Sequence, residues 1–264
     1  MALQFVGSTI GSVAGTGGIT LNLAALSGGI ASAAAVDDLV VVFHGWASTA
    51  NGSPAVTSPA ATLIADLYAN NNNDANLGAS CFFYDGSTST VTVNSVNAAI
   101  AALQVWRGAD RITPLDATPV TAVNGTTNAI NPPAITPVTA NAAVLVGALI
   151  ATETAGTVSN PTGFTSANAG SRNGTGIGAG LRSAYKTGNA AGVAVNPSSL
   201  SCTTGGNGSS GAAFTIALRP SLGRAKHWNG AAWRASPVKV WNGSAWVLKP
   251  MKRWSGSAWI LTDY

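Results

Sequence analysis

The sequence predicts an all-β protein: a duplicated antiparallel β-sandwich of jelly-roll type over residues 1–220, followed by a short Trp-rich array of β-hairpin repeats over residues 224–264. Gly, Ala, Ser, Thr and Asn dominate the 264 residues, a composition that favours short strands and tight turns over helices. Apolar runs of strand length recur between Gly- and Asn-rich stretches. A 13-residue unit occurs three times at the C-terminus. Together these observations favour a sandwich or jelly roll.

The first half of the sandwich, about residues 35–110, contains four runs that predict strands. The first run is continuously apolar and fits a buried strand, whereas the third alternates between polar and apolar residues. One further stretch, Pro59–Leu67, is compatible with a short helix. The four predicted strands are Leu39–Phe43, Asn76–Tyr84, Thr90–Val93 and Ala98–Arg107.

The second half, about residues 140–220, repeats this pattern in the same order. Matched positions of the two halves are separated by 101 to 112 residues, and such near-constant offsets favour an old duplication. Chance similarity between apolar strands is the alternative. The four matching runs are Val144–Ala148, Gly178–Tyr185, Gly192–Val195 and Ala213–Arg219.

Prolines concentrate in residues 113–137, between the two halves. Proline donates no backbone hydrogen bond, so in β proteins it is confined to edge strands and extended connections. We therefore expect this stretch to run over the surface or along a sheet edge. Two separate small sandwiches divided at this stretch are the alternative to one duplicated sandwich.

The C-terminal repeats place two tryptophans in each unit, on either side of an Asn-Gly or Ser-Gly pair that signals a hairpin. Four residues separate the two tryptophans, so a four-residue loop places the indoles opposite each other. A short hairpin cannot bury its own apolar face, so we expect contacts with the sandwich or with symmetry mates. The predicted partner-binding residues are Trp228, Trp233, Trp241, Trp246, Trp254, Trp259, Lys239, Lys252 and Arg253.

Charge is distributed unevenly along the chain. Residues 224–264 carry seven basic side chains against one aspartate, a net charge of +6, whereas residues 1–223 carry −2. A basic, Trp-rich segment suits a polyanionic partner such as a teichoic acid, a lipopolysaccharide or an acidic protein. The alternative is that the lysine at the start of each repeat is a solvated charge that keeps edge strands from aggregating.

Hydrolase and dinucleotide-binding motifs fail when they are tested against their structural requirements. A buried strand followed by His44 and Gly45 also introduces the oxyanion loop of α/β-hydrolases, but the chain has no Gly-x-Ser-x-Gly nucleophile motif. We interpret His44 as a strand-end residue with a backbone partner. The string Gly206–Gly211 precedes a predicted strand instead of opening a helix, so it indicates a turn and not a dinucleotide site.

Carboxylates are too few and too scattered to predict a glycosidase. That chemistry needs two facing carboxylates, and the one adjacent pair, Asp37 and Asp38, points to opposite faces of a strand. We therefore expect no enzyme activity and no catalytic residues. A glycan depolymerase, the enzyme alternative, would rest on Asp85, Asp110 or Glu153.

The remaining site classes lack their signatures. Cys81 and Cys202 show neither a disulfide framework nor a zinc spacing, and we expect two buried free thiols, although one bridge stays open. The Asn-rich cluster Asn70–Asp74 is the one loop with clustered oxygen ligands, which a solvated loop tip also explains. We expect no metal, no cofactor, no signal peptide and no membrane-spanning segment.

The repeat Lys239-Val-Trp-Asn-Gly-Ser-Ala-Trp, continued through Trp259, resembles the C-terminal arrays of minor tail and tail-fibre-like virion proteins of tailed bacteriophages. The run Asp37–Phe43, with a later strand that ends in Trp-Arg-Gly, is similar to the β-sandwich modules of such proteins. The array covers 39 residues and the sandwich resemblance about 180. No collagen-like or coiled-coil stalk is present, which favours a compact appendage over a long fibre.

This resemblance implies a structural or adhesion role in the virion, as a tail-fibre-like, minor tail or surface-appendage subunit. A head-decoration or head-fibre protein is the alternative location. The expected partners are further copies of the chain, with a trimer as the guess by analogy, other virion proteins and a host surface glycan. Nucleic acid is not among them.

Overall fold

The computed structural model describes residues 3–204, 208–221, 225–228, 233–236, 238–249, 252–254 and 259–261. Every regular element in these ranges is a β-strand, and none of them is helical. The strand pairs of the large sheets are all antiparallel. The all-β prediction is therefore confirmed.

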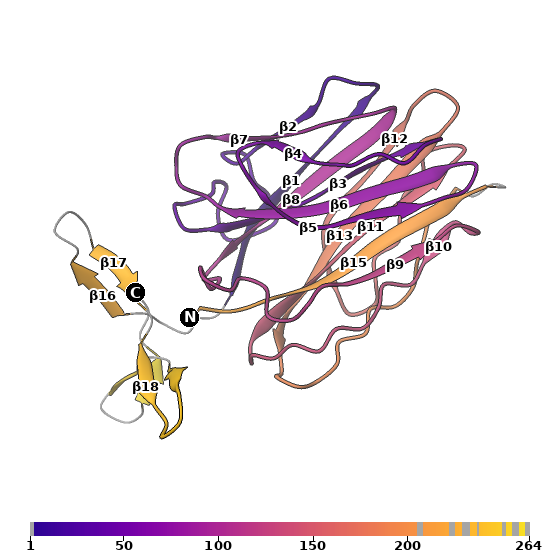
Figure 1. The fold of residues 1–264 in the computed structure, drawn as a ribbon. Helices are drawn as coiled ribbons and strands as arrows, with labels where there is room; N and C mark the ends of the chain where they lie inside the picture. The colour runs from indigo at the N-terminus through magenta and orange to yellow at the C-terminus, as the bar shows by residue number, and fades with distance from the viewer. Residues whose placement is uncertain are drawn as a thin grey trace.

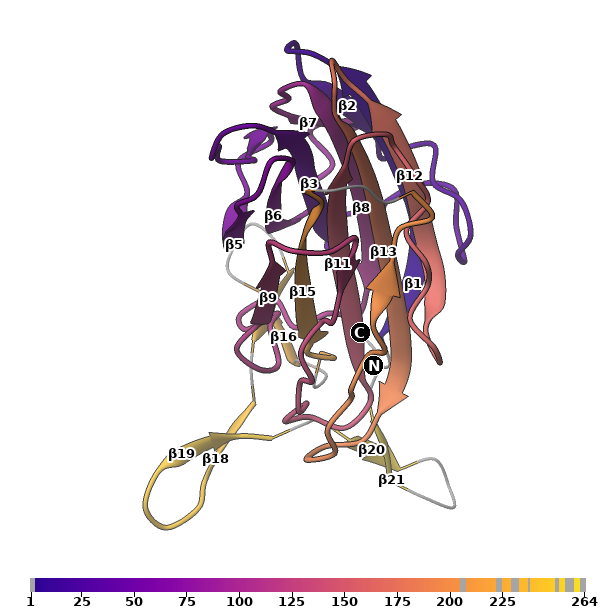
Figure 2. The same cartoon turned by 90° about the vertical axis from the view of Figure 1, so that its right-hand side faces the viewer.

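Two five-stranded sheets face each other and form the body of the protein, which is β-sandwich-like (Figures 1 and 2). The strands of the first sheet are β1 (Gln4–Ala14), β3 (Leu39–Ser48), β5 (Thr62–Ala69), β6 (Asp74–Phe83) and β8 (Ala98–Arg107). The strands of the second sheet are β9 (Val120–Asn124), β11 (Ala142–Thr152), β12 (Thr165–Asn173), β13 (Gly178–Asn189) and β15 (Ser210–Leu218).

The strand order is the same in both sheets. It is β1-β8-β3-β6-β5 in the first and β9-β15-β11-β13-β12 in the second. In each sheet the earliest strand lies at an edge beside the latest strand, and the second strand in chain order occupies the centre. The proline-rich stretch 113–137 contains the edge strand β9, as expected for a segment with few backbone donors.

Small sheets cover the outer faces of the two large ones. The strands β2 (Ile19–Asn22), β7 (Thr90–Val93) and β4 (Val56–Ser58) pack on the first sheet, and β10 (Ala129–Ile130) with β14 (Leu200–Ser201) packs on the second. The described residues therefore form three apolar cores, one between the large sheets and one beneath each cover. This layering explains why β3 and β11 are buried along their whole length and carry apolar residues on both faces.

Two local predictions are wrong. Residues 59–67 do not form a helix: most of them belong to β5, whose backbone groups pair with β6. Gly192–Val195 does not form the counterpart of Thr90–Val93, because Gly192 adopts a positive φ of 72° and only Val195 makes a bridge, to Ile135. By its place in the strand order, the counterpart of β7 is β14.

Candidate binding surfaces

The C-terminal strands form three antiparallel pairs: β16 (Ala225–Trp228) with β17 (Trp233–Ser236), β18 (Lys239–Trp241) with β19 (Trp246–Leu248), and β20 (Lys252–Trp254) with β21 (Trp259–Leu261). In each pair the two tryptophans are directly opposite each other: Trp228 and Trp233, Trp241 and Trp246, and Trp254 and Trp259. Each predicted aromatic pair therefore occupies one register position. The side chains of the first and third pairs, and those of Lys252 and Arg253, lie outside the described residues.

The middle pair shows how this sequence builds its turn. The Asn242 side-chain oxygen accepts hydrogen bonds from the backbone amides of Ser244 and Ala245, and Gly243 supplies a positive φ of 102°. The indoles of Trp241 and Trp246 lie with their centroids 5.8 Å apart at 59°. These side chains are 52% and 65% exposed, and Lys239 beside them is exposed as well. The hairpin thus presents two indoles to solvent, a composition typical of binding surfaces.

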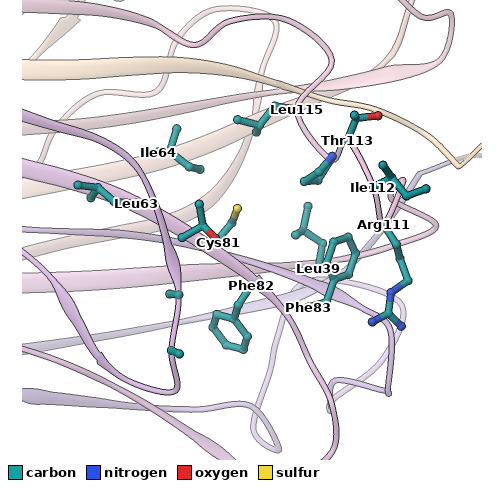
Figure 3. A pocket seen from close by; sticks show the side chains of 14 residues that line it. Leu39, Leu63, Ile64, Cys81, Phe82, Phe83, Arg111, Ile112, Thr113 and Leu115 are labelled. Carbon is teal, nitrogen blue, oxygen red and sulfur yellow. The ribbon is translucent and has the colours of Figure 1, made fainter.

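A second candidate surface, absent from the sequence predictions, is an apolar pocket of about 850 Å³ at the β6-β5 edge of the first sheet; Figure 3 shows its lining. It lies between β5, the end of β6 and the segment that follows β8. Its volume falls in the range of clefts that take small ligands. The labelled lining residues are Leu39, Leu63, Ile64, Cys81, Phe82, Phe83, Arg111, Ile112, Thr113 and Leu115.

Arg111 is the one charged residue in the lining of this pocket. Its guanidinium lies 5.2 Å from the centroid of the Phe83 ring and forms an ion pair with Asp37. Cys81 lies deeper, and burial raises the pKa of its thiol to about 11. A thiol with this pKa is a poor nucleophile at neutral pH, so the pocket is suited to binding apolar groups and not to thiol chemistry. The expected free state of Cys81 and Cys202 is confirmed.

Of the three carboxylates that the depolymerase alternative would need, Asp110 and Asp85 accept local hydrogen bonds and Glu153 is exposed. Asp110 accepts hydrogen bonds from the amides of Ile112 and Thr113. Asp85 accepts from Ser87 in an exposed turn, and these bonds lower its pKa. Asp38 is buried and accepts two hydrogen bonds of 2.9 Å from Arg107, while the adjacent Asp37 is exposed. The two do not alternate on a strand as predicted, because both precede β3 and Asp37 lies in a turn with a φ of 76°.

Side chains of the Asn-rich loop Asn70–Asp74 make hydrogen bonds to neighbouring protein groups. Asp74 accepts hydrogen bonds from the amide of Asn71 and the hydroxyl of Tyr68, and Asn71 donates to the carbonyl of Ser209. Within the described ranges, no group of three or more His, Cys, Asp or Glu side chains is placed to hold a metal ion. None of the described residues forms a helix long and apolar enough to cross a bilayer.

His44 does not lie at a strand end with a backbone partner, and that interpretation is wrong. It occupies the middle of β3, between Gly78 and Ala101 of the neighbouring strands, and its Nε2 lies 3.2 Å from the hydroxyl of Ser80. Its Nδ1 has no hydrogen-bond partner among the described residues. The apolar run that precedes His44 continues as strand through Ser48, which buries the ring beneath the cover of the first sheet.

We expect the buried His44 to make the fold sensitive to mild acid. Burial lowers its pKa from 6.5 to about 4, so between these values the unfolded chain binds a proton that the folded chain does not. Stability is therefore full above pH 6.5 and falls as the pH drops toward 4, by about 2 kcal/mol between pH 7 and pH 5. Urea unfolding at both pH values measures the loss. In His44→Gln the difference should largely vanish; an unchanged difference would assign it to other groups.

Comparisons with models of protein families, with curated proteins and with solved structures find no match for this chain.

Proposed function

We propose that the protein is a structural subunit of a bacteriophage or phage-like particle, a tail-fibre-like, minor tail or surface-appendage subunit that acts in assembly and host attachment. The observation that carries this proposal is the exposed Trp241–Trp246 pair within a basic segment of repeated hairpins. Two exposed indoles on a rigid turn suit binding to another surface far better than catalysis. The buried carboxylates of Asp38 and Asp110 are engaged in structural hydrogen bonds, which also favours a structural role.

We further propose that the body is a duplicated jelly roll. An eight-stranded jelly roll places its first, last, third and sixth strands side by side, in an arrangement common in viral capsid proteins and lectins. The order β1-β8-β3-β6 has this form, and the second sheet repeats it with one fewer cover strand. The repeated order supports duplication independently of the sequence offsets. Strand order alone carries no function, so the virion role still rests on the hairpins.

Deletion of residues 224–264 tests the role of the hairpins in particles. If particles incorporate the truncated chain but no longer adsorb to host cells, the hairpins are the adhesin. If incorporation fails while the truncated chain stays folded, the hairpins are the assembly anchor, which is the result we expect because the indoles leave so much apolar surface open. Normal incorporation together with normal adsorption would contradict both roles.

The double substitution Trp241→Ala and Trp246→Ala should abolish incorporation without unfolding the body. Both indoles are more than half exposed, so the circular dichroism and the unfolding midpoint of the purified chain should stay within experimental error of the parent. Quantitative immunoblots of purified particles measure incorporation. Val138→Ala, at an exposed valine of the body that is not among the predicted binding residues, is the control and should leave incorporation unchanged. Normal incorporation of the double variant would contradict the anchor role.

A further inference from the structure

The repeated strand order makes the two lateral edges of the body equivalent, and these edges are filled differently. At the β1-β8 edge, the rings of Phe5, Trp106 and Tyr185 pack between the large sheets, with centroid distances of 4.4 to 5.4 Å. At the β6-β5 edge lies the apolar pocket between β5, β6 and residues 111–115. The register of the sheets identifies the residues that take the place of the three rings at the pocket.

Each ring has a counterpart at an equivalent position. Phe5 lies opposite Trp106, the residue before Arg107. Leu115 lies opposite Leu218, the residue before Arg219. Leu115 is therefore the counterpart of Phe5, and Leu218 is the counterpart of Trp106.

The third counterpart follows from the central strands. Tyr185 lies opposite Leu145 of β11, and Cys81 lies opposite Val41 of β3. On its other side Leu145 pairs with Ile216, two residues before Leu218, and Val41 pairs with Gln104, two residues before Trp106. Leu145 and Val41 therefore occupy equivalent positions. Cys81 is accordingly the counterpart of Tyr185. Three aromatic side chains at one edge therefore correspond to two leucines and a cysteine at the other. Two of these three counterparts, Leu115 and Cys81, line the pocket, so smaller side chains stand there at the positions that aromatic rings occupy at the equivalent edge.

We propose that this pocket is the docking site for the indoles of the Trp241–Trp246 hairpin of a second copy of the chain. Both halves of such a contact are exposed in the single chain: the two indoles on the hairpin, and Leu63 and Ile112 at the pocket, which are 55% and 60% exposed. Seating the indoles removes both apolar surfaces from water at once. Because the hairpin of one copy meets the pocket of another, the contact either closes reciprocally between two copies or continues from copy to copy as a larger ring or a chain.

The charges of the two surfaces are complementary. Residues 1–115, which supply the whole lining, contain six aspartates and two arginines, a net charge of −4, against +6 for residues 224–264. Three of these aspartates are buried, and the lining residue Arg111 is paired with the exposed Asp37. Two exposed aspartates, Asp66 on β5 and Asp85 after β6, follow the lining residues Leu63 and Phe83 by three and two positions. Lys239 and Lys249, both exposed, flank the indole pair on the hairpin. This arrangement favours encounter of the hairpin with the first half of a neighbouring molecule.

Disulfide cross-linking between two differently marked full-length chains tests the contact. One chain carries Ile112→Cys at the pocket, and the other carries Ser244→Cys in the exposed turn between the indoles. Both chains also carry Cys81→Ala because Cys81 lines the pocket, whereas the native Cys202 is buried outside the lining. In an equimolar mixture we expect the mixed disulfide at about ten times the yield of a control pair in which Val138→Cys, at an exposed valine outside the pocket, replaces Ile112→Cys. Adding Trp241→Ala and Trp246→Ala to the hairpin chain should reduce the yield to the control level.

Charge substitutions at the pocket rim provide a second readout that needs no new thiol. Leu63→Lys with Ile112→Lys should weaken self-association in sedimentation equilibrium by about 30-fold, the loss expected for a central contact. Val138→Lys with Val193→Lys, the same change at two exposed valines outside the lining, should leave it unchanged. Equal effects of the two pairs would overturn the docking site.

Two further outcomes would also overturn it. One is a mixed-disulfide yield equal to the control. The other is a disulfide that forms within a doubly substituted chain but not between chains, which would assign the pocket to the hairpin of the same molecule. The inference rests on the assembly role proposed above. Because these experiments use the purified chain alone, their failure removes the contact, whereas the virion role fails only if particles lack the protein.

Discussion

Gly147→Val is expected to destabilise the body by about 3 kcal/mol, a large share of the 5–15 kcal/mol that holds a typical domain together. Gly147 lies at the centre of β11, where the second large sheet faces the first: a Cβ atom added there would lie 2.2 Å from the ring of Phe43 on β3. Neither side can retreat, because both strands are buried along their whole length. Urea unfolding of the purified variant measures the loss.

The double variant Phe43→Ala with Gly147→Val separates this clash from a general intolerance of β11. If the valine fails only because it meets the Phe43 ring, it should cost clearly less in the Phe43→Ala background than alone. Additive costs would mean that the two central strands do not pack at this point, which would contradict the facing arrangement of the sheets.

Trp106→Ala is expected to cost about 3–5 kcal/mol, as for other large buried aromatic side chains. The Trp106 ring is fully buried, packs against Phe5 and Tyr185, and donates a hydrogen bond from its Nε1 to Gln104. Its removal leaves a cavity at the junction of the two sheets. The control is Trp241→Ala, whose indole is 52% exposed and whose loss should change the unfolding free energy of the chain by less than about 0.5 kcal/mol. Similar losses for the two variants would contradict the burial assigned to them.

Strand positions were the most predictable part of the fold, because apolar runs and their alternation are local signals. Thr90–Val93 and Ala98–Arg107 coincide with β7 and β8. The helix expected at residues 59–67 failed because the local residue pattern does not reveal that β6 supplies hydrogen-bond partners along that stretch. His44 was misplaced for a related reason: a polar side chain suggests the end of a buried run, yet the run continues beneath a covering sheet.

Of the two candidate binding surfaces, the sequence predicted the tryptophan hairpins but not the apolar pocket. The position of each tryptophan pair in the register followed from the spacing of the repeats, whereas the apolar pocket could not be predicted. Its walls come from Leu63, Phe82 and Ile112, which meet only after β5 pairs with β6 and the chain beyond β8 folds back. Leu115 and Cys81 occupy the positions at the pocket that Phe5 and Tyr185 occupy at the equivalent edge. This relation depends on strand register, which the sequence alone does not give, so the pocket could not be recognised from the sequence.

The central claim is that this chain is a structural subunit of a virus-like particle, and quantitative mass spectrometry of purified particles tests it most directly. Particles from cells that express the chain together with its particle genes should retain it through density-gradient and high-salt purification, at a fixed number of copies relative to the other structural proteins. Recovery of the chain only in the soluble fraction, with particles that are complete and infectious without it, would contradict the account.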